Sequence, residues 1–255
     1  MKINRILSLL TLVIGLGAAS PALSAETHVA VAANFTAAAK EIAAAYEEKT
    51  GDKVVLSFGS TGQLATQIVN GAPYDVFLAA DSARPVKLED DGYTGSSHPR
   101  FTYAIGKLVL WSPDPKTVDA EGEVLKTGDF EKLAVANPKT APYGAAAMET
   151  LEKLGLTDSL TPKLVFGQNV AQTQQFISTG AAALGFIALA QVVNLEGGSK
   201  WIVPETLYAP INQQAVLLKK GDDNAAARAF VDYLQGAEAG AIIARYGYAT
   251  EKPGS

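Results

Sequence analysis

The chain has 255 residues, of which 48% are hydrophobic and 18% are charged, and its formal net charge is −5 at pH 7. It contains no cysteine, which excludes disulfides, thiolate metal sites, a cysteine nucleophile and a lipid anchor on cysteine. The excess of acidic residues offers no electrostatic footprint for nucleic acid or for anionic lipid, so we expect no nucleic-acid partner.

The first 25 residues have the pattern of a secretory signal peptide. Lys2 and Arg5 precede an apolar run, residues 6–19, and small residues follow up to Ala25. The run is shorter than the ~20 apolar residues that a membrane-spanning helix needs. We therefore expect residues 1–25 to be removed and the rest to be a soluble periplasmic protein. Loss of the two basic residues moves the net charge from −5 to −7. Any anion site must then depend on local geometry rather than on overall charge.

Short β-type runs alternate with helical stretches along the first part of the mature chain. A glycine, Gly51, lies where a helix C-terminus favours one. The predicted order is strand 28–33, helix 35–49, strand 53–58, helix 64–69, strand 75–80 and helix 84–90. This order is typical of a parallel sheet with right-handed crossovers.

A second unit of the same kind begins near Lys107. Residues 211–218 are polar at the start and apolar at the end, as in a strand that crosses between two lobes. The predicted strands are 108–111, 133–136, 163–166, 184–188 and 201–203, and the predicted helices are 145–154, 172–178, 225–234 and 237–246. We therefore predict an α/β protein with two lobes, each a mainly parallel sheet flanked by helices, and a cleft between them. Residues 26–107 with 214–255 form the predicted lobe 1, and residues 108–213 form lobe 2.

Two turns of the first unit carry candidate binding residues. In open α/β sheets, ligands bind beyond the carboxyl ends of the strands, where helix N-termini offer free N–H groups to anions. Asn34 is either an amide donor to an anion or a helix cap, and capping is favoured for this turn alone. Ser60 lies between Gly59 and Gly62 and is either a plain N-cap or part of an anion-binding nest. The turn lacks the lysine of a phosphate-binding P-loop.

Two further turns lie in the second unit. Tyr143 stands just ahead of a predicted helix, and its hydroxyl is either a donor to a ligand or part of a packed aromatic side chain. Val170 offers only its main-chain N–H, at the start of another helix. Each turn alone is a weak signal. Four turns at equivalent positions, two in each unit, would direct helix N-termini into one cleft.

Several segments of the chain resemble the periplasmic molybdate-binding proteins of bacterial molybdate importers. These segments are VAVAANFTAAA, FGSTGQLATQIVNGAPYDVFLAAD, NPKTAPYG and GQNVAQ, and the likeness continues to RYGY at residues 245–248. The resemblance implies a type II periplasmic-binding fold that closes on molybdate or tungstate. It also implies delivery of the anion to the membrane permease of an ABC importer, without a cofactor and without catalysis. We expect the protein to be a monomer.

The resemblance also implies which residues contact the anion. Carried over by position, the contacts are Asn34, Ser60, Tyr143 and Val170, with Ala33 as a further contact through its N–H. Molybdenum or tungsten would enter only as the bound oxyanion, through these same residues. Enteric members of the family have serine at the position of Asn34 and a tyrosine at the position that matches Ala188. Because Ala188 has no hydroxyl, we infer that Tyr143 supplies the phenolic donor.

Such a site would contain donors and no acceptor. A fully deprotonated dianion needs only donors, whereas hydrogen phosphate needs an acceptor for its proton, so the site would discriminate against phosphate. Sulfate has the same charge and shape as molybdate and can be rejected only by cavity size. A binding protein for sulfate or another tetrahedral oxyanion is therefore the alternative.

Two other functions, serine hydrolysis and binding of ferric ion, are less consistent with the sequence than binding of an oxyanion. A serine hydrolase with Ser60 as its nucleophile needs a base, and the only histidines, His28 and His98, are expected at the surface. The turn also differs from the G-x-S-x-G elbow of α/β-hydrolases. A ferric-ion site would need clustered tyrosines, carboxylates or histidine. Tyr246 and Tyr248 have no such partners in the sequence and are interpreted as packing residues.

Overall fold

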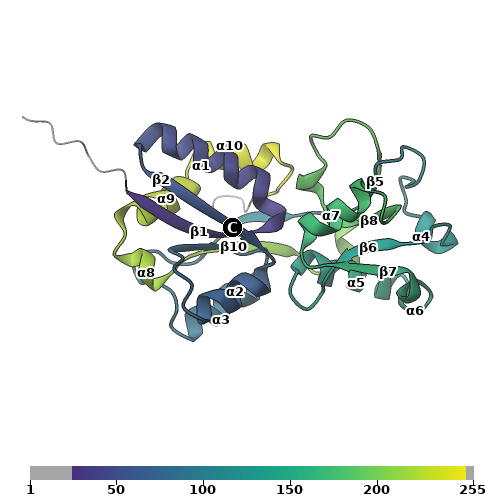
Figure 1. The fold of residues 1–255 in the computed structure, drawn as a ribbon, viewed down its shortest axis with the longest axis horizontal. Helices are drawn as coiled ribbons and strands as arrows, with labels where there is room; N and C mark the ends of the chain where they lie inside the picture. Colours follow the sequence, from purple (N-terminus) through teal and green to yellow (C-terminus); the bar gives the residue numbers. More distant parts are fainter. Residues whose placement is uncertain (1–24, 251–255) are drawn as a thin grey trace, which may run out of the picture.

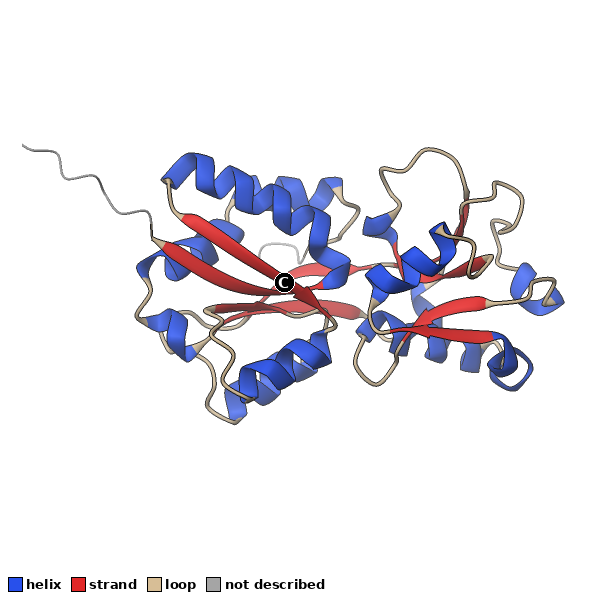
Figure 2. Ribbon diagram, in the orientation of Figure 1, coloured by secondary structure: helices blue, strands red, loops and turns tan. Residues whose placement is uncertain are grey.

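The computed structural model describes residues 25–250, so nearly all of the expected signal peptide lies outside the described residues. These residues form two α/β lobes, each built on a five-stranded sheet (Figure 1; Figure 2). In each sheet, one strand runs against the other four, which confirms the predicted two-lobe fold with mainly parallel sheets. Within the described residues, no helix is long and apolar enough to cross a membrane.

The sheet of lobe 1 has the strand order β2-β1-β3-β10-β4. Strand β1 pairs in parallel with β2 and β3, and β10 pairs antiparallel with β3 and β4. The strands are β1 (Glu26–Ala32), β2 (Lys53–Gly59), β3 (Val76–Leu78), β4 (Phe101–Gly106) and β10 (Ile211–Leu217).

Helices cover both faces of this sheet. On one face, α1, α9 and α10 bury residues such as Ile42 and Phe230 against the strands, and on the other, α2 and α3 bury Leu64 and Leu88 (Figure 1). The helices of lobe 1 are η1 (Ala33–Phe35), α1 (Thr36–Thr50), α2 (Thr61–Val69), α3 (Ala83–Asp90), α8 (Lys219–Asp222), α9 (Ala225–Leu234) and α10 (Ala237–Arg245).

The sheet of lobe 2 has the order β7-β6-β8-β5-β9, with α5 packed on one face through Leu151 and α7 on the other through Ile177. Its strands are β5 (Leu108–Ser112), β6 (Leu133–Ala136), β7 (Leu164–Gly167), β8 (Leu184–Ala188) and β9 (Ser199–Ile202). Its helices are α4 (Val124–Thr127), α5 (Pro142–Lys153), α6 (Thr157–Leu160), η2 (Thr161–Lys163), α7 (Val170–Ser178), η3 (Leu189–Gln191) and η4 (Glu205–Leu207).

The two connections between the lobes leave from the ends of strands β4 and β10, and we refer to this region as the hinge. The two strands are neighbours in the sheet of lobe 1, and Gly106, the last residue of β4, pairs with Ile211, the first residue of β10. From these two ends the chain passes into and out of lobe 2. Strand β4 was not predicted from the sequence. Strand β10 does not cross between the lobes as predicted, because its whole length pairs within the sheet of lobe 1.

Three helices that reach the space between the lobes begin earlier than their hydrophobic pattern predicts, at Thr61, Pro142 and Val170. Their first turns lack the periodic apolar residues from which helices are predicted. They are instead supported by caps and by proline at the first helical position, which is a favourable place for it. These unpredicted first turns border the space between the lobes.

Candidate functional site

A small, tight cavity of about 10 Å³ lies between the two lobes. All five residues predicted to contact a ligand line it, and none of them is more than 5% exposed. The described residues that line the cavity carry no charged side chain. They are Ala32, Ala33, Asn34, Gly59, Ser60, Thr61, Ala80, Ala141, Pro142, Tyr143, Asn169 and Val170.

Four helical segments begin at this cavity, two from each lobe. They start at Ala33, Thr61, Pro142 and Val170. The first N–H groups of a helix have no partner within the helix, and they carry partial positive charge. An uncharged cavity surrounded by such N–H groups is suited to bind an anion.

Ser60 is the N-cap of α2, as predicted. Its hydroxyl oxygen accepts from the main-chain N–H of Gln63 at 3.4 Å and donates to Gln63 Oε1 at 2.9 Å. Among the described residues, neither histidine is a hydrogen-bond partner of this hydroxyl, since His28 pairs with Glu26 and His98 with Asp232. The arrangement lacks the base that a serine nucleophile requires.

Asn34 does not cap a helix, so the interpretation favoured for that turn is wrong. It lies within η1, and the N-cap of α1 is Phe35. The side-chain Nδ2 of Asn34 donates to Gln213 Oε1 at 2.6 Å and to the hydroxyl of Tyr248 at 3.1 Å. Both N–H bonds of the amide are therefore engaged within the protein. What Asn34 can present to a ligand is its main-chain N–H at the start of the helical segment.

Tyr143 lies in the first turn of α5 rather than ahead of it. Burial raises the pKa of its hydroxyl well above the usual value of 10, so the hydroxyl stays protonated. Gln213 Nε2 donates to the Tyr143 oxygen at 3.4 Å. A Cβ atom at Gly106 would overlap this oxygen, so a glycine at the end of β4 allows Tyr143 to reach the hinge.

Val170 begins α7 as predicted, and Asn169 is the N-cap of that helix. Asn169 Oδ1 accepts from the N–H groups of the second and third helical residues, both at 3.0 Å. Gln191 links this helix to β8, because its Nε2 donates to the Val170 carbonyl and its Oε1 accepts from Ala188 N–H, each at 3.0 Å. Sequence reasoning missed Thr61 and Asn169 as cavity residues. For Asn169, its preference for N-cap positions was an available signal.

The lobes also touch at the rim of the cavity. Gly62 N–H donates to the carbonyl of Thr140 at 2.9 Å, and Arg84 Nη2 donates to the carbonyl of Lys139 at 3.0 Å. Arg84 also pairs with Asp81 on its own lobe. With these contacts made and the cavity residues almost fully buried, the structure is in a closed state.

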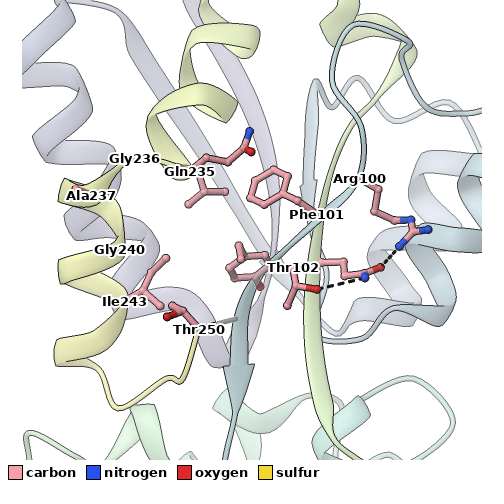
Figure 3. A pocket seen from close by; sticks show the side chains of 12 residues that line it. Arg100, Phe101, Thr102, Gln235, Gly236, Ala237, Gly240, Ile243 and Thr250 are labelled. Carbon is pink, nitrogen blue, oxygen red and sulfur yellow. Dashed lines mark hydrogen bonds between the residues drawn. The ribbon is translucent and has the colours of Figure 1, made fainter. Parts of the chain in front are cut away.

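A second pocket, wider and open, lies between β4 and the start of α10 (Figure 3). The charge of Arg100 in this pocket is engaged, because Arg100 donates to Gln214 Oε1 at 2.6 Å and pairs with Glu89 at 3.1 Å. One helix N-terminus borders this pocket, whereas four helical segments begin at the closed cavity. The described residues contain no cluster of histidine, aspartate and glutamate that could hold a metal ion. We therefore place the candidate site in the closed cavity.

Comparison with known proteins gives the family. Residues 27–249 match the bacterial extracellular solute-binding protein family. The chain is 55% identical to the molybdate-binding protein ModA of Rhodobacter capsulatus over 244 residues, which cover 95% of this chain and 94% of that protein. It is 57% identical to the Azotobacter vinelandii ModA over 247 residues, which cover 94% of this chain and 98% of that protein. This chain belongs to the ModA family.

The fold of the two lobes is also that of a solved ModA protein. The solved periplasmic molybdate-binding protein of Azotobacter vinelandii superposes with a TM-score of 0.85 at 42% sequence identity. The match covers 89% of this chain and 100% of that one. Because ModA proteins are solute-binding proteins, this chain is a binding protein and not an enzyme.

Proposed function

We propose that this protein binds molybdate or tungstate in the closed cavity and delivers the anion to the membrane permease of an ABC importer. The observation that carries the proposal is the convergence of four helical N-termini on an uncharged, buried cavity. Such a cavity favours a small anion. The 55% and 57% identities to ModA proteins identify the class of anion.

The proposed donors are of two kinds. Ala33, Asn34 and Val170 provide main-chain N–H groups, and Ser60 and Tyr143 provide hydroxyls. Hydrogen bonds to a charged group contribute about 1.5–3 kcal/mol each, so several of them can offset the absence of a basic side chain. The partial positive charges of the helix ends add to this attraction.

Binding requires one local rearrangement at Ser60. Its hydroxyl proton points to Gln63 Oε1 in this structure, at 2.9 Å. To donate to an anion, the hydroxyl must turn away from Gln63 and toward the cavity. Gln63 is exposed, so its freed oxygen can be hydrated by solvent.

The anion is the cargo of the protein, and no cofactor is part of the mechanism. We propose that residues 1–25 direct export and are then removed, and that the mature protein acts as a monomer in the periplasm. The predicted division was residues 26–107 with 214–255 and residues 108–213. Because β10 pairs with strands of lobe 1 from Ile211 onward, we assign residues 211–213 to lobe 1 as well. Both lobes hold the anion, and opening at the hinge releases it to the permease.

A thermal-shift screen of the purified mature protein tests this function. Molybdate and tungstate should each raise the melting temperature, because a ligand at 100 times its Kd adds about 2.7 kcal/mol of stability. Sulfate and phosphate at the same concentration should leave it unchanged. Stabilisation by sulfate but not by molybdate would assign the protein to a different oxyanion.

A further inference from the structure

A chain of hydrogen bonds passes behind the cavity through Gln213, a fully buried side chain on the hinge strand β10. Its Oε1 accepts from Asn34 Nδ2 at 2.6 Å. The one proton of the Tyr103 hydroxyl is shared between this oxygen, at 3.2 Å, and the carbonyl of Ala79, at 3.1 Å. Its Nε2 donates to the Tyr143 hydroxyl oxygen at 3.4 Å. Asn34 and Gln213 belong to lobe 1 and Tyr143 to lobe 2, so this chain joins the lobes beside the proposed ligand.

The direction of these hydrogen bonds is fixed by Tyr248. Its hydroxyl lies 2.8 Å from the main-chain oxygen of Asn34, and a carbonyl oxygen can only accept, so the Tyr248 proton points there. The Tyr248 oxygen must then accept from the Asn34 side-chain atom 3.1 Å away, which is therefore the amide nitrogen. That nitrogen in turn requires the oxygen of Gln213 as its acceptor. The nitrogen of Gln213 is left to face Tyr143.

The Tyr143 hydroxyl therefore accepts a hydrogen bond from the protein, donated by Gln213. Among the hydrogen bonds of the described residues, none uses the proton of this hydroxyl, whereas its oxygen is already engaged by Gln213. The side chain borders the cavity and keeps its proton, since burial raises its pKa. The proton of Tyr143 is thus available to a ligand.

We infer that Gln213 is a positioning residue that sets ligand specificity by making Tyr143 a donor only. The inference rests on the proposed function. A phenol can both donate and accept, so a free tyrosine could turn to accept the proton of hydrogen phosphate. With Gln213 donating to it, Tyr143 offers its proton to a fully deprotonated oxyanion and offers no acceptor to a protonated one. The buried proton of hydrogen phosphate then lacks a partner, which is unfavourable.

A double-mutant cycle between Gln213→Met and Tyr143→Phe tests this inference. Calorimetric titrations with molybdate and with inorganic phosphate at neutral pH give both affinities for each variant. Gln213→Met should weaken molybdate binding on the order of tenfold when Tyr143 is present, and should have little further effect when it is phenylalanine. The ratio of molybdate to phosphate affinity should fall in Gln213→Met. Additive effects of the two substitutions, or an unchanged ratio, would overturn the inference.

The next residue of the same strand supplies a matched control. The side chain of Gln214 contacts Arg100 and Thr102 at the open pocket, so Gln214→Met should leave the affinity ratio unchanged. An equal fall of the ratio in this control would overturn a specific role for Gln213. If Gln213→Met does not fold, Tyr248→Phe replaces it, since it removes the group that fixes the direction of the chain. That variant should also lower the ratio, and an unchanged ratio would again overturn the inference.

These measurements separate the inference from the function on which it rests. Wild-type protein that does not bind molybdate contradicts the proposed function. Wild-type protein that binds molybdate tightly, together with an unchanged ratio in Gln213→Met, contradicts only the role of Gln213.

Discussion

At the scale of single residues, Ser60 combines two tasks, because one hydroxyl caps α2 and borders the cavity. Ser60→Ala should lower molybdate affinity roughly ten- to hundredfold, the effect of losing one hydrogen bond to a charged group. Loss of the cap should cost about 1 kcal/mol of stability as well. Calorimetric titration and thermal unfolding measure the two effects. Ser57→Ala, on β2 but away from the cavity, is the control, and unchanged affinity in Ser60→Ala would remove Ser60 from the site.

The raised pKa of Tyr143 leads to a prediction about pH. Because burial holds this pKa well above 10, the hydroxyl remains a donor throughout the neutral and mildly alkaline range. Tyr143→Phe should therefore weaken molybdate binding by the same factor at about pH 7 and at about pH 9.5. Titrations of both proteins at these two pH values provide the comparison. A wild-type affinity that declines toward the variant's value as pH rises would show that Tyr143 ionises within this range.

The positions of Ser60 and Val170 follow from the sequence because helix starts are local features. Both lie at helix N-termini, as turn chemistry predicts, although the hydrophobic pattern alone places the two helix starts later in the chain. The role of the Asn34 amide could not be predicted in this way. Its partners Gln213 and Tyr248 are 179 and 214 residues away in sequence, so only the folded chain reveals that the amide is engaged. For the same reason, Gln213 was not a candidate.

At the scale of elements, one carboxylate holds the segment ahead of β4 against α8. Asp222 accepts from the hydroxyl and the main-chain N–H of Ser97, and from the main-chain N–H of Ser96. These hydrogen bonds, led by that of the Ser97 hydroxyl, lower the pKa of Asp222 to about 2. A carboxylate with a lowered pKa stabilises the fold above its unfolded pKa of about 3.9, and that stability is lost as pH falls toward 2.

Asp222→Asn should therefore be less stable than wild type at about pH 6, and the difference should shrink below about pH 4. Urea unfolding of both proteins across this range measures the difference. Asp223→Asn is the matched control, since this neighbouring carboxylate is exposed and should give little change at any pH. A difference in stability that is constant with pH would contradict the account of Asp222.

Elements with strong hydrophobic patterns were predicted well, and those defined by long-range pairing were not. Strands β6 and β8 and helix α9 have the predicted bounds, because each is a continuous apolar or amphipathic run. Strand β4 was missed, since only its pairing with the distant β10 makes it part of the sheet. The same pairing keeps β10 within lobe 1. The hinge was therefore the part of the fold that sequence patterns could not locate.

At the scale of the whole molecule, closure depends on a few contacts between the lobes. The guanidinium of Arg84 reaches the carbonyl of Lys139 across the rim, so Arg84→Ala should favour the open state. Dissociation of molybdate should become roughly fivefold faster, which corresponds to about 1 kcal/mol for one hydrogen bond, while the association rate changes less. Stopped-flow fluorescence measures both rates.

The control for this prediction is Lys87→Ala on the same helix, α3. Lys87 pairs at 2.9 Å with Asp91, the C-cap residue of the same helix, so its loss removes a similar charge without removing the contact between Arg84 and Lys139. The association and dissociation rates of molybdate for Lys87→Ala should match those of wild type. Equal dissociation rates for Arg84→Ala and wild type would mean that the rim contact does not hold the closed state.

Whole-molecule charge and local geometry act in opposite directions in this protein. The net charge, −5 for the full chain and −7 without residues 1–25, repels an anion at long range, while the uncharged cavity and its helix ends attract one at short range. Isothermal titration of the purified mature protein with molybdate tests this balance most directly. We predict tight binding of one molybdate per chain, which excess sulfate does not weaken. Absence of heat with molybdate, or displacement of molybdate by equimolar sulfate, would contradict the account.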